Sequence, residues 1–260
     1  MKILNKYIRN DIKLNKKRSI SLIIGIAMST MLICSILIIS MSFYETFYND
    51  VKVTKGNYHN TFFRVEDKEI ITNNEEIESC FVTQEKGYVN LPESDGREYI
   101  AVLEFDEKAL NNYGLKLIEG RMPKNTNEII ISNEVIENGK INYYVGQTVD
   151  FEINKIKLDE NNVLTQRTTY LKEMKEEGRI QEEFIEKKEY KIVGIIQRPN
   201  EAIESYKAAG YTAITLMDGI QDNAGYSVRF KNANKALELA EKLAQDNNLL
   251  YNTNYDLLNY

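Results

Sequence analysis

The sequence predicts an α+β domain, built from a mixed sheet with short helices, that is preceded by one N-terminal transmembrane helix. Three observations lead to this prediction. An uncharged, mostly apolar run covers residues 19–44. Basic residues crowd the short tail before that run, whereas the rest of the chain is acidic. In that acidic remainder, short β-branched segments alternate with short helix-like segments, which is the pattern of an α+β domain.

Residues 19–44 are predicted to cross a membrane as one helix. A hydrophobic stretch of about 18 or more residues without charges is typical of a spanning helix, because the hydrocarbon core offers backbone groups no partner except each other. Roughly 25 residues at a rise of about 1.5 Å cover about 37 Å, which suffices for a core about 30 Å thick. The chain is thus divided into a tail (residues 1–18), a transmembrane helix (residues 19–44) and an outer domain (residues 45–260).

Charge predicts which side of the membrane each part occupies. The tail carries seven basic residues and one acid, a net charge of +6, so the chain's net charge of −6 leaves −12 for residues 45–260. Lys and Arg close to a span favour the cytoplasmic side. We therefore expect a plasma-membrane protein with a cytoplasmic N-terminus and an extracytoplasmic main domain. The Asn-, Lys- and Ile-rich composition without Trp further favours a bacterial membrane.

A cleaved secretory signal is the competing interpretation of the same N-terminus. Its apolar core would span about 7–15 residues and end in small residues at a cleavage site. Here the run is longer and continues into the aromatic segment 43–48, which suits an interfacial belt. An uncleaved anchor is therefore the prediction.

The tail is predicted to form a basic amphipathic helix. On a helical wheel at about 100° per residue, six of its basic residues share one narrow sector and apolar residues fill the opposite half. Such a helix can lie at the inner leaflet with its cations toward anionic headgroups. The alternative is a topology signal that happens to be helical. Nucleic acid is not an expected partner, since the chain as a whole is acidic.

Small residues recur every four positions within the predicted span, at Ser21, Gly25 and Ser29. Such a stripe lets another helix approach closely, so these residues are predicted to form a transmembrane packing face toward further spans or a second copy of the chain. The alternative is that Gly and Ser are simply common in spanning helices. Cys34, midway along the run, is expected to pack as a small apolar residue.

The outer domain is long enough to bury a large core. Strands are expected where short runs are apolar or β-branched, at residues 60–66, 99–105, 128–132, 144–153, 189–196, 211–217 and 226–230. Short helices are expected at residues 74–79, 106–113, 133–138 and 233–244, and Asp106 is the expected cap of the second. Residues 117–123 are expected to lead into a Gly/Pro turn. Residues 154–188 are expected to form a charged insert that is helical over 169–187.

Several kinds of chemistry are not expected. The chain has no G-x-x-x-x-G-K-[ST] phosphate-binding loop and no EF-hand spacing, and its single histidine is His59, so neither a cofactor nor a metal site is predicted. The sequence also has no G-x-S-x-G motif that would supply a nucleophilic serine for a triad with His59. No catalytic residues are therefore predicted. Cys80 is the one cysteine of the outer domain, which excludes an internal disulfide there and favours a buried structural thiol.

Four short motifs follow one another in the outer domain. The first three have the forms L-x-L-x-x-G-R-x-P, N-E-I-x-I-S and V-G-x-x-V, and they begin at Leu115, Asn127 and Val145. The fourth is an aromatic-x-V-V-G-I strand, matched at residues 190–195. In this order and spacing, behind a first span with its N-terminus inside, the motifs resemble the MacB/FtsX-like permease subunits of ABC transporters. The residues that carry the resemblance are Gly120, Arg121, Pro123, Glu128, Gly146 and Gly194.

Physical roles can be assigned to these motif residues. Gly120 and Gly146 suit turn positions that need positive φ. Pro123 fixes the entry to a loop, and Glu128 can satisfy buried backbone groups or Arg121. The motif residues are therefore expected to determine the fold rather than to form a ligand site.

The resemblance implies a permease subunit that couples ATP hydrolysis by a separate ABC ATPase to movement of an extracytoplasmic domain, for the export of, or resistance to, peptides and amphiphiles. The implied partners are that ATPase, the remaining permease spans or a second permease copy, the lipid bilayer and an extracellular peptide or protein. Family members continue into at least three more spans, so the chain is expected to be the N-terminal part of a permease. The alternative is a single-span, membrane-anchored binding or sensor module; an enzyme is not expected.

Overall fold

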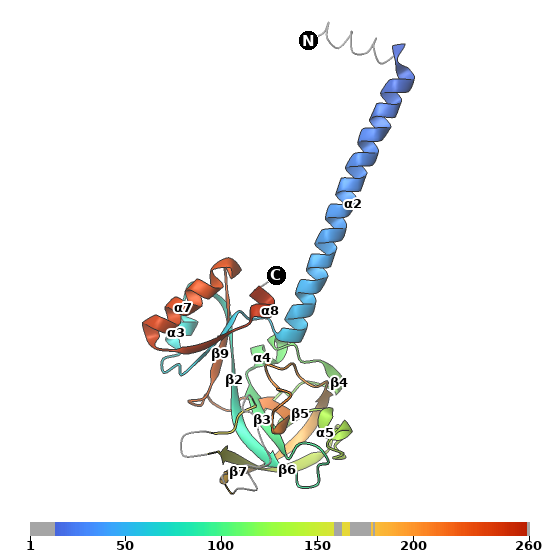
Figure 1. Cartoon of the computed structure of the whole chain (residues 1–260). Coiled ribbons are helices and arrows are strands. Elements are labelled where there is room, and N and C mark those ends of the chain that lie inside the picture. The colour runs from blue at the N-terminus through green and yellow to red at the C-terminus, as the bar shows by residue number, and fades with distance from the viewer. Residues whose placement is uncertain (1–13, 159–162, 167–177, 179, 259–260) are drawn as a thin grey trace. The chain divides into compact units, whose positions relative to one another are not determined.

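The computed structural model describes residues 14–158, 163–166, 178 and 180–258, and the chain divides into two compact units, Met1–Asn49 and Asp50–Tyr260. The predicted amphipathic helix of the tail lies mostly outside the described residues. Helix α2 (Lys16–Lys55) covers the predicted transmembrane segment and continues beyond it (Figure 1). Among the described helices, α2 is the one that is long and apolar enough to cross a membrane.

Several hydroxyl groups within α2 bond to the backbone of the helix itself. Ser29 Oγ donates to Gly25 O at 2.9 Å, and Ser35 Oγ donates to Met31 O at 2.8 Å. A hydroxyl satisfied in this way does not need water as a partner. The large apolar side chains along the helix are exposed. Both properties suit a helix that is surrounded by lipid.

The second unit is an α+β domain, as the sequence predicts. Its strands are β1 (Asn60–Phe63), β2 (Ile77–Asn90), β3 (Tyr99–Phe105), β4 (Leu117–Gly120), β5 (Glu128–Ser132), β6 (Thr148–Lys157), β7 (Gln181–Ile196), β8 (Gly210–Leu216), β9 (Gly225–Phe230) and β10 (Leu250–Thr253). Its helices are α3 (Glu69–Thr72), α4 (Glu107–Asn112), α5 (Glu134–Glu137), η1 (Ala233–Lys235), α7 (Ala236–Asn247) and α8 (Tyr255–Leu258).

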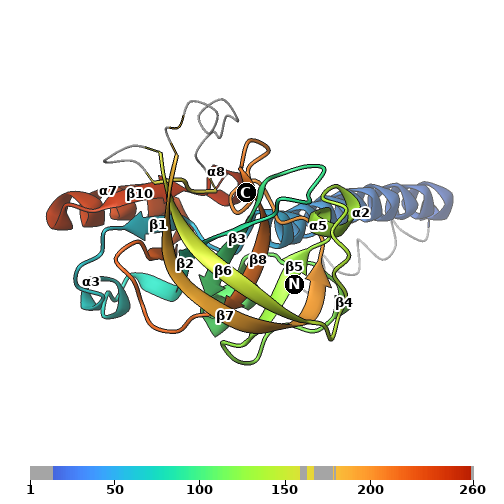
Figure 2. The same ribbon diagram turned by 90° about the horizontal axis from the view of Figure 1, so that it is seen from below.

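The strands form one mixed sheet in the order β10-β1-β9-β2-β3-β8-β5-β7-β4, and β6 pairs with both β2 and β7. Because of this double pairing, β2, β3, β8, β5, β7 and β6 close into a ring (Figure 2). The pairs β3–β8 and β5–β7 are parallel. The other pairs are antiparallel.

A bulge in β2 permits the ring to close. The register between β2 and β3 shifts between Glu85 and Gly87, and beyond the shift Tyr88 pairs with Asn154 of β6. A Cβ atom on Gly87 would lie 2.7 Å from Asn154 O, so glycine is needed for β6 to come this close. Bulges also bend a strand. The middle of β2 is therefore the place where the two parts of the sheet meet.

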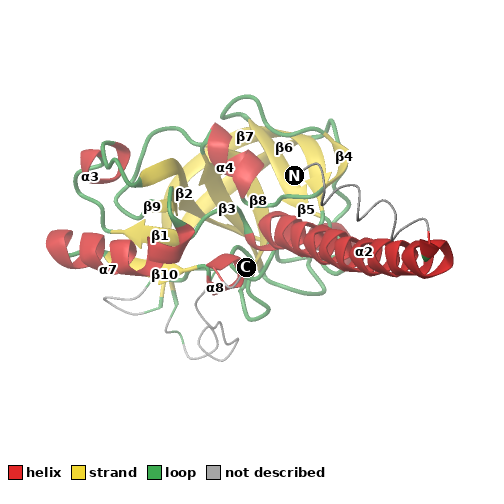
Figure 3. Ribbon diagram, turned by 90° about the horizontal axis from the view of Figure 1, so that it is seen from above, coloured by secondary structure: helices red, strands yellow, loops and turns green. Residues whose placement is uncertain are grey.

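The domain has three hydrophobic clusters, two of which divide between the two parts of the sheet. The first half of β2 pairs with β9, and on that side α3 and α7 contribute to a core that includes Phe62, Val228 and Ala240 (Figures 1 and 3). The second half of β2 pairs with β3. There a second core, which includes Ile129 and Phe151, draws residues from all six strands of the ring. The shared strand β2 joins the two parts.

Two of the expected elements are wrong. Residues 74–79 do not form a helix, because Ile77–Asn90 is one long strand in register with β9 and β3. The described part of the charged insert is not helical either, since residues 154–157 extend β6 and residues 181–188 extend β7. Lys157 pairs across this hairpin with Glu183 at 2.6 Å. Residues 169–177 and 179 of the expected helix lie outside the described residues.

The other expected strands and helices are confirmed, although their ends differ in places. Asp106 caps α4, since its Oδ1 accepts from Ala109 N at 2.6 Å and its Oδ2 accepts from Val82 N at 2.9 Å. Cys80 is half-buried. Burial, followed by the charge of Asp106, raises the pKa of the Cys80 thiol to about 12, which keeps it protonated and unreactive.

The buried side chain of His59 gives a prediction for pH. Its Nδ1 accepts from Phe230 N at 3.0 Å, and burial, followed by the charge of Arg229, lowers the pKa of His59 from 6.5 to about 4. Between these values the unfolded chain binds a proton that the folded domain does not. The free energy of unfolding is therefore expected to fall as the pH decreases through this range.

Chemical denaturation of the full chain in detergent at several pH values tests this expectation. The slope of stability against pH should be smaller in His59→Asn, whose amide oxygen can accept the same backbone hydrogen bond without titrating. Identical slopes for the wild type and the variant would contradict the assigned role of His59.

Candidate functional site

The motif residues meet at one edge of the ring, where β4, β7 and β5 lie side by side. Gly120 of β4 pairs directly with Gly194 of β7. A Cβ atom on Gly120 would lie 2.2 Å from Val193 O, and one on Gly194 would lie 2.5 Å from Arg121 O. Both positions need glycine because the two backbones approach so closely.

An ion pair fastens the turn between β4 and β5. The two terminal nitrogens of Arg121 donate to the two carboxylate oxygens of Glu128, each at 2.6 Å. Lys124 N donates to the same carboxylate at 2.8 Å, so the bonds enclose the turn that contains Pro123. The hydrogen bond from Arg121 outweighs the effect of burial and lowers the pKa of Glu128 to about 2. The carboxylate is thus ionised and fully engaged within the turn.

Gly146, which comes shortly before β6, joins the same region beside β7. It has a φ of +96°, and its N–H donates to Ile192 O at 2.8 Å. A Cβ atom there would meet nothing within 4 Å, so the left-handed backbone, and not lack of space, is what favours glycine. The polar groups of the motif residues are therefore occupied by one another and by the backbone around β7.

Replacing Arg121 with Gln is expected to return the pKa of Glu128 from about 2 toward its ordinary value of 4.5. Because the pKa in the folded domain lies below that in the unfolded chain, the ion pair stabilises the domain above about pH 4, and this stabilisation is lost as the pH falls toward 2. The stability difference between the wild type and Arg121→Gln should therefore be clearly larger at pH 5 than at pH 3.

The matched control for this prediction is Lys124→Gln, which keeps the backbone N–H that bonds to Glu128. Its stability should follow the wild type at both pH values. A stability difference for Arg121→Gln that is as large at pH 3 as at pH 5 would show that the ion pair is not its cause.

The predicted transmembrane packing face lies in the other unit. Ser21, Gly25 and Ser29 are spaced four residues apart on α2 and so share one face of the helix. A Cβ atom on Gly25 would meet nothing within 4 Å. This face is open to a second helix, and its use in packing stays a prediction.

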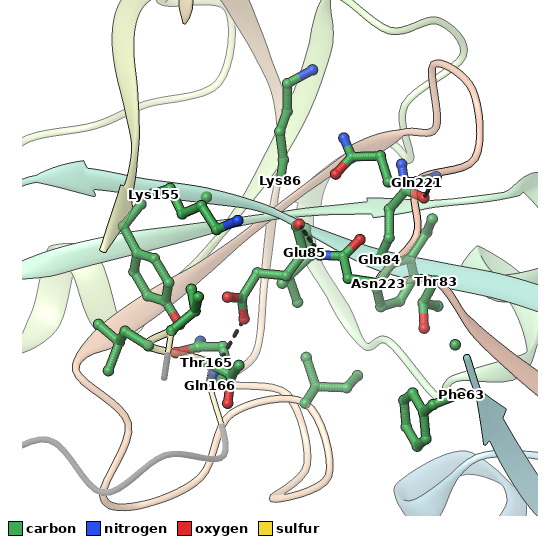
Figure 4. Close-up of a pocket in the computed structure, with 18 of the residues that line it drawn as sticks. Phe63, Thr83, Gln84, Glu85, Lys86, Lys155, Thr165, Gln166, Gln221 and Asn223 are labelled. Carbon is green, nitrogen blue, oxygen red and sulfur yellow. Dashed lines mark hydrogen bonds between the residues drawn. The ribbon is translucent and has the colours of Figure 1, made fainter. Parts of the chain in front are cut away.

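A cavity of about 680 Å³ lies beside the bulge in the middle of β2. Apolar side chains from several elements line it, including Leu103, Phe105, Tyr113, Ile156, Leu164 and Ile203. Polar side chains complete the lining; Figure 4 shows Lys155, Glu85, Thr165 and Gln166 toward one side of the view and Gln84, Gln221 and Asn223 toward the other. A cavity of this volume whose exposed wall is mostly apolar is typical of small-molecule sites.

Several of these polar groups hold the cavity wall together. Asn223 Nδ2 donates to Glu85 O at 2.8 Å, and Gln221 N donates to Gln84 Oε1 at 2.9 Å. Gln166 N donates to the Glu85 carboxylate at 3.0 Å. Burial, followed by the negative charge of Glu85, raises the pKa of Tyr88 well above its ordinary value, so this lining phenol stays neutral.

A buried charge network flanks the bulge. Lys86 Nζ lies 2.8 Å from Glu104 Oε1 and 2.8 Å from Glu186 Oε1, and the side chains of Lys86 and Glu104 are 9% and 1% exposed. Gln84 Nε2 donates to the other oxygen of Glu104 at 2.6 Å. Burial lowers the pKa of Lys86, but its hydrogen bonds with Glu104 and Glu186 outweigh burial, so the net pKa is raised and Lys86 stays charged.

The sequence does not predict this cavity, because its lining comes from segments far apart in the chain. One signal was present. Glu104 stands in the otherwise apolar run 99–105, and a carboxylate in a fully buried strand needs a cationic or hydrogen-bonding partner. Among the described residues, no group of three His, Cys, Asp or Glu side chains could hold a metal ion. The arrangement suits the binding of a small apolar molecule.

No protein-family model and no curated protein sequence matches the chain. Several solved structures are similar to it. The periplasmic region of MacB from Actinobacillus actinomycetemcomitans has a TM-score of 0.40 and 9% identity, over 80% of this chain and 94% of that one. The extracellular domain of the noncanonic ABC-type transporter YknZ from Gram-positive bacteria has a TM-score of 0.41 and 11% identity, over 76% and 99%.

The third structure is a domain of a putative permease protein from Porphyromonas gingivalis. Its TM-score is 0.38 with 10% identity, over 75% of this chain and 85% of that chain. MacB is one of the names of the family that the sequence motifs resemble, and the other two names refer to an ABC-type transporter and a permease.

Proposed function

We propose that this chain is the N-terminal portion of an ABC transporter permease, which transmits ATP hydrolysis by a separate ATPase subunit to movement of an extracytoplasmic domain. The observation that supports the proposal most is the ordered motif series at residues 115–151 and 190–195, behind an uncharged helix. The contact of Gly120 with Gly194 and the bidentate pair of Arg121 and Glu128 give those motifs one common location.

Each part of the chain has a role in this proposal. Helix α2 is the first span, with residues 1–18 in the cytoplasm and residues 45–260 outside. Ser21, Gly25 and Ser29 pack against further permease spans or a second copy, and the basic tail lies on the inner leaflet near the ATPase. Transport serves the export of, or resistance to, peptides or amphiphiles, and the motif residues maintain the fold of the moving domain.

Affinity purification from the native membrane in mild detergent, through a tag on the cytoplasmic N-terminus, tests the proposal. Mass spectrometry should identify a co-purifying protein with a G-x-x-x-x-G-K-[ST] loop at a stoichiometric level. A variant in which Lys6, Arg9, Lys13 and Lys17 are all replaced with Gln should recover less of the ATPase, while the chain itself stays in the membrane fraction. If the membranes contain such an ATPase at native levels and the chain is recovered without it, the result would oppose the proposal.

The cavity beside β2 favours a second candidate, a single-span anchored module that binds a ligand without a transport cycle. Its volume of about 680 Å³ and apolar lining suit ligand capture. In this case the stripe on α2 serves self-association. A chain that dimerises through Gly25, loses dimerisation in Gly25→Leu and binds no ATPase would favour the module over the permease.

A further inference from the structure

We infer that the cavity beside β2 is a binding site for an uncharged, mostly apolar molecule that carries one N–H or O–H donor. The inference goes beyond the proposed transport function and does not depend on it. The lining residues all belong to the unit Asp50–Tyr260. Ligand binding there requires neither an ATPase nor further spans.

The size and the lining of the cavity determine the body of the ligand. About 680 Å³ can enclose a molecule of roughly drug size. The aromatic and aliphatic side chains that face it include Phe105, Tyr113, Ile156 and Leu164. Burying apolar surface against such side chains is favourable because it removes that surface from water. An alkyl or aryl group therefore fills most of the space.

The side chain of Gln166 is the reason why the ligand is expected to carry a hydrogen-bond donor. Its side-chain Nε2 donates to Gly210 O and to Thr212 Oγ1, each at 3.2 Å. Because a backbone carbonyl only accepts, the amide nitrogen must face β8, and this fixes the position of Oε1. The residue is 4% exposed, and its Oε1 is buried without a partner. A buried acceptor without a partner is costly. Because Gln166 lines the cavity, a donor on a molecule that enters it satisfies Oε1 after a small movement of the side chain.

The charged groups that line the cavity favour a neutral ligand. The charged groups along the lining are of both signs, with Lys155 opposed by Glu85 and Asp222. Lys86 is already paired with two carboxylates. A ligand ion of either sign would meet a like charge as well as an opposite one, so it gains little to offset the loss of its hydration.

Photolabelling of the full chain in lipid nanodiscs tests the inference with two matched probes. The first is N-butyl-4-benzoylbenzamide, which is neutral and apolar and has one N–H donor. The second is its N-methyl derivative, which lacks that donor. Mass spectrometry of the digested protein separates labelling at the cavity, in peptides with residues 163–166, 202–203 or 221–225, from labelling of the apolar helix at residues 19–44.

The first probe is expected to label the cavity peptides saturably, and about fivefold more than the N-methyl probe, which is the effect of one hydrogen bond. Gln166→Met should make the two probes equal. Ala202→Trp should abolish labelling of the cavity because the indole ring fills the space. Glu201→Trp adds the same ring at the preceding, exposed position and should leave the labelling of the cavity unchanged.

Three results would each overturn the inference. They are saturable labelling confined to residues 19–44, equal labelling of the wild-type cavity by the two probes, and full labelling in Ala202→Trp. Thermal unfolding of each variant checks that the domain is folded, and the pair Glu201→Trp and Ala202→Trp keeps the test valid if Gln166→Met is unstable. The outcome does not depend on whether an ATPase is present, so failure here and failure of the permease proposal are distinguishable.

Discussion

Replacing Gly114 with alanine is expected to destabilise the outer domain by about 3 kcal/mol. Gly114 follows α4 and has a φ of +66°. A Cβ atom there would lie 1.6 Å from Val53 O and 2.5 Å from Val53 C, in the last part of α2. Both contacts are with backbone, so no rotation of a side chain can relieve them. For a domain of this size the melting temperature should fall by about 10 °C.

Gly219→Ala is the matched control for Gly114→Ala. Gly219 also has a positive φ, +87°, but a Cβ atom there would meet nothing within 4 Å. This variant therefore carries only the cost of a left-handed backbone, about 1 kcal/mol. Thermal unfolding of the full chain in detergent, followed by circular dichroism, compares the two. Equal losses would mean that the end of α2 does not press against Gly114 in solution.

Replacing Lys86 with methionine is expected to cost about 3–5 kcal/mol, because it leaves a buried carboxylate without its cation. Glu104 is 1% exposed and lies 2.8 Å from Lys86 Nζ. Methionine keeps much of the length and apolar stem of lysine, so the loss reports the missing charge more than a missing volume. Chemical denaturation at neutral pH measures the effect.

A second substitution separates charge from packing. In Lys86→Met/Glu104→Gln the pair is neutral, and the amide oxygen introduced by Glu104→Gln can still accept from Gln84. We expect this double variant to recover most of the stability, to within about 1 kcal/mol of the wild type. If Lys86→Met alone costs less than about 1 kcal/mol, or if the double variant is no better than the single one, the network is not a buried ion pair in the folded protein.

The elements that the sequence predicts correctly are those with local signals. The run 128–132 is apolar and β-branched, and Asp106 precedes a helix as a capping residue should. The amphipathic spacing of the alanines in α7 likewise depends only on nearby residues. Such features are visible because the period of the side chains and the caps are set within a few residues.

The elements that the sequence does not predict depend on contacts between distant segments. The middle of β2 is polar, and the bulge at Gly87 interrupts its alternation, so its strand character follows from pairing with β9, β3 and β6. The charged stretch before β7 resembles a solvated helix because opposite charges recur along it. In the structure those charges pair across a hairpin, as Lys157 and Glu183 do.

The candidate sites divide in the same way. The motif residues around β7 are recognisable from sequence, because Gly, Arg, Pro and Glu follow one another in the order of the family motifs. The cavity beside β2 is not, because the closure of the ring brings together segments that are far apart in the chain, such as Phe63, Lys155 and Asn223. Its only local hint is Glu104, which marks the buried network next to it.

Cysteine labelling tests directly whether residues 1–18 and 45–260 lie on opposite sides of a membrane crossed by α2. Single cysteines at Asn5 and at the exposed Lys207, in a chain with Cys34→Ser and Cys80→Ala, can be labelled with a membrane-impermeant maleimide in spheroplasts. We expect Lys207→Cys to be labelled in intact spheroplasts and Asn5→Cys only after lysis. The reverse pattern, or a mature protein that lacks residues 1–44, would contradict it.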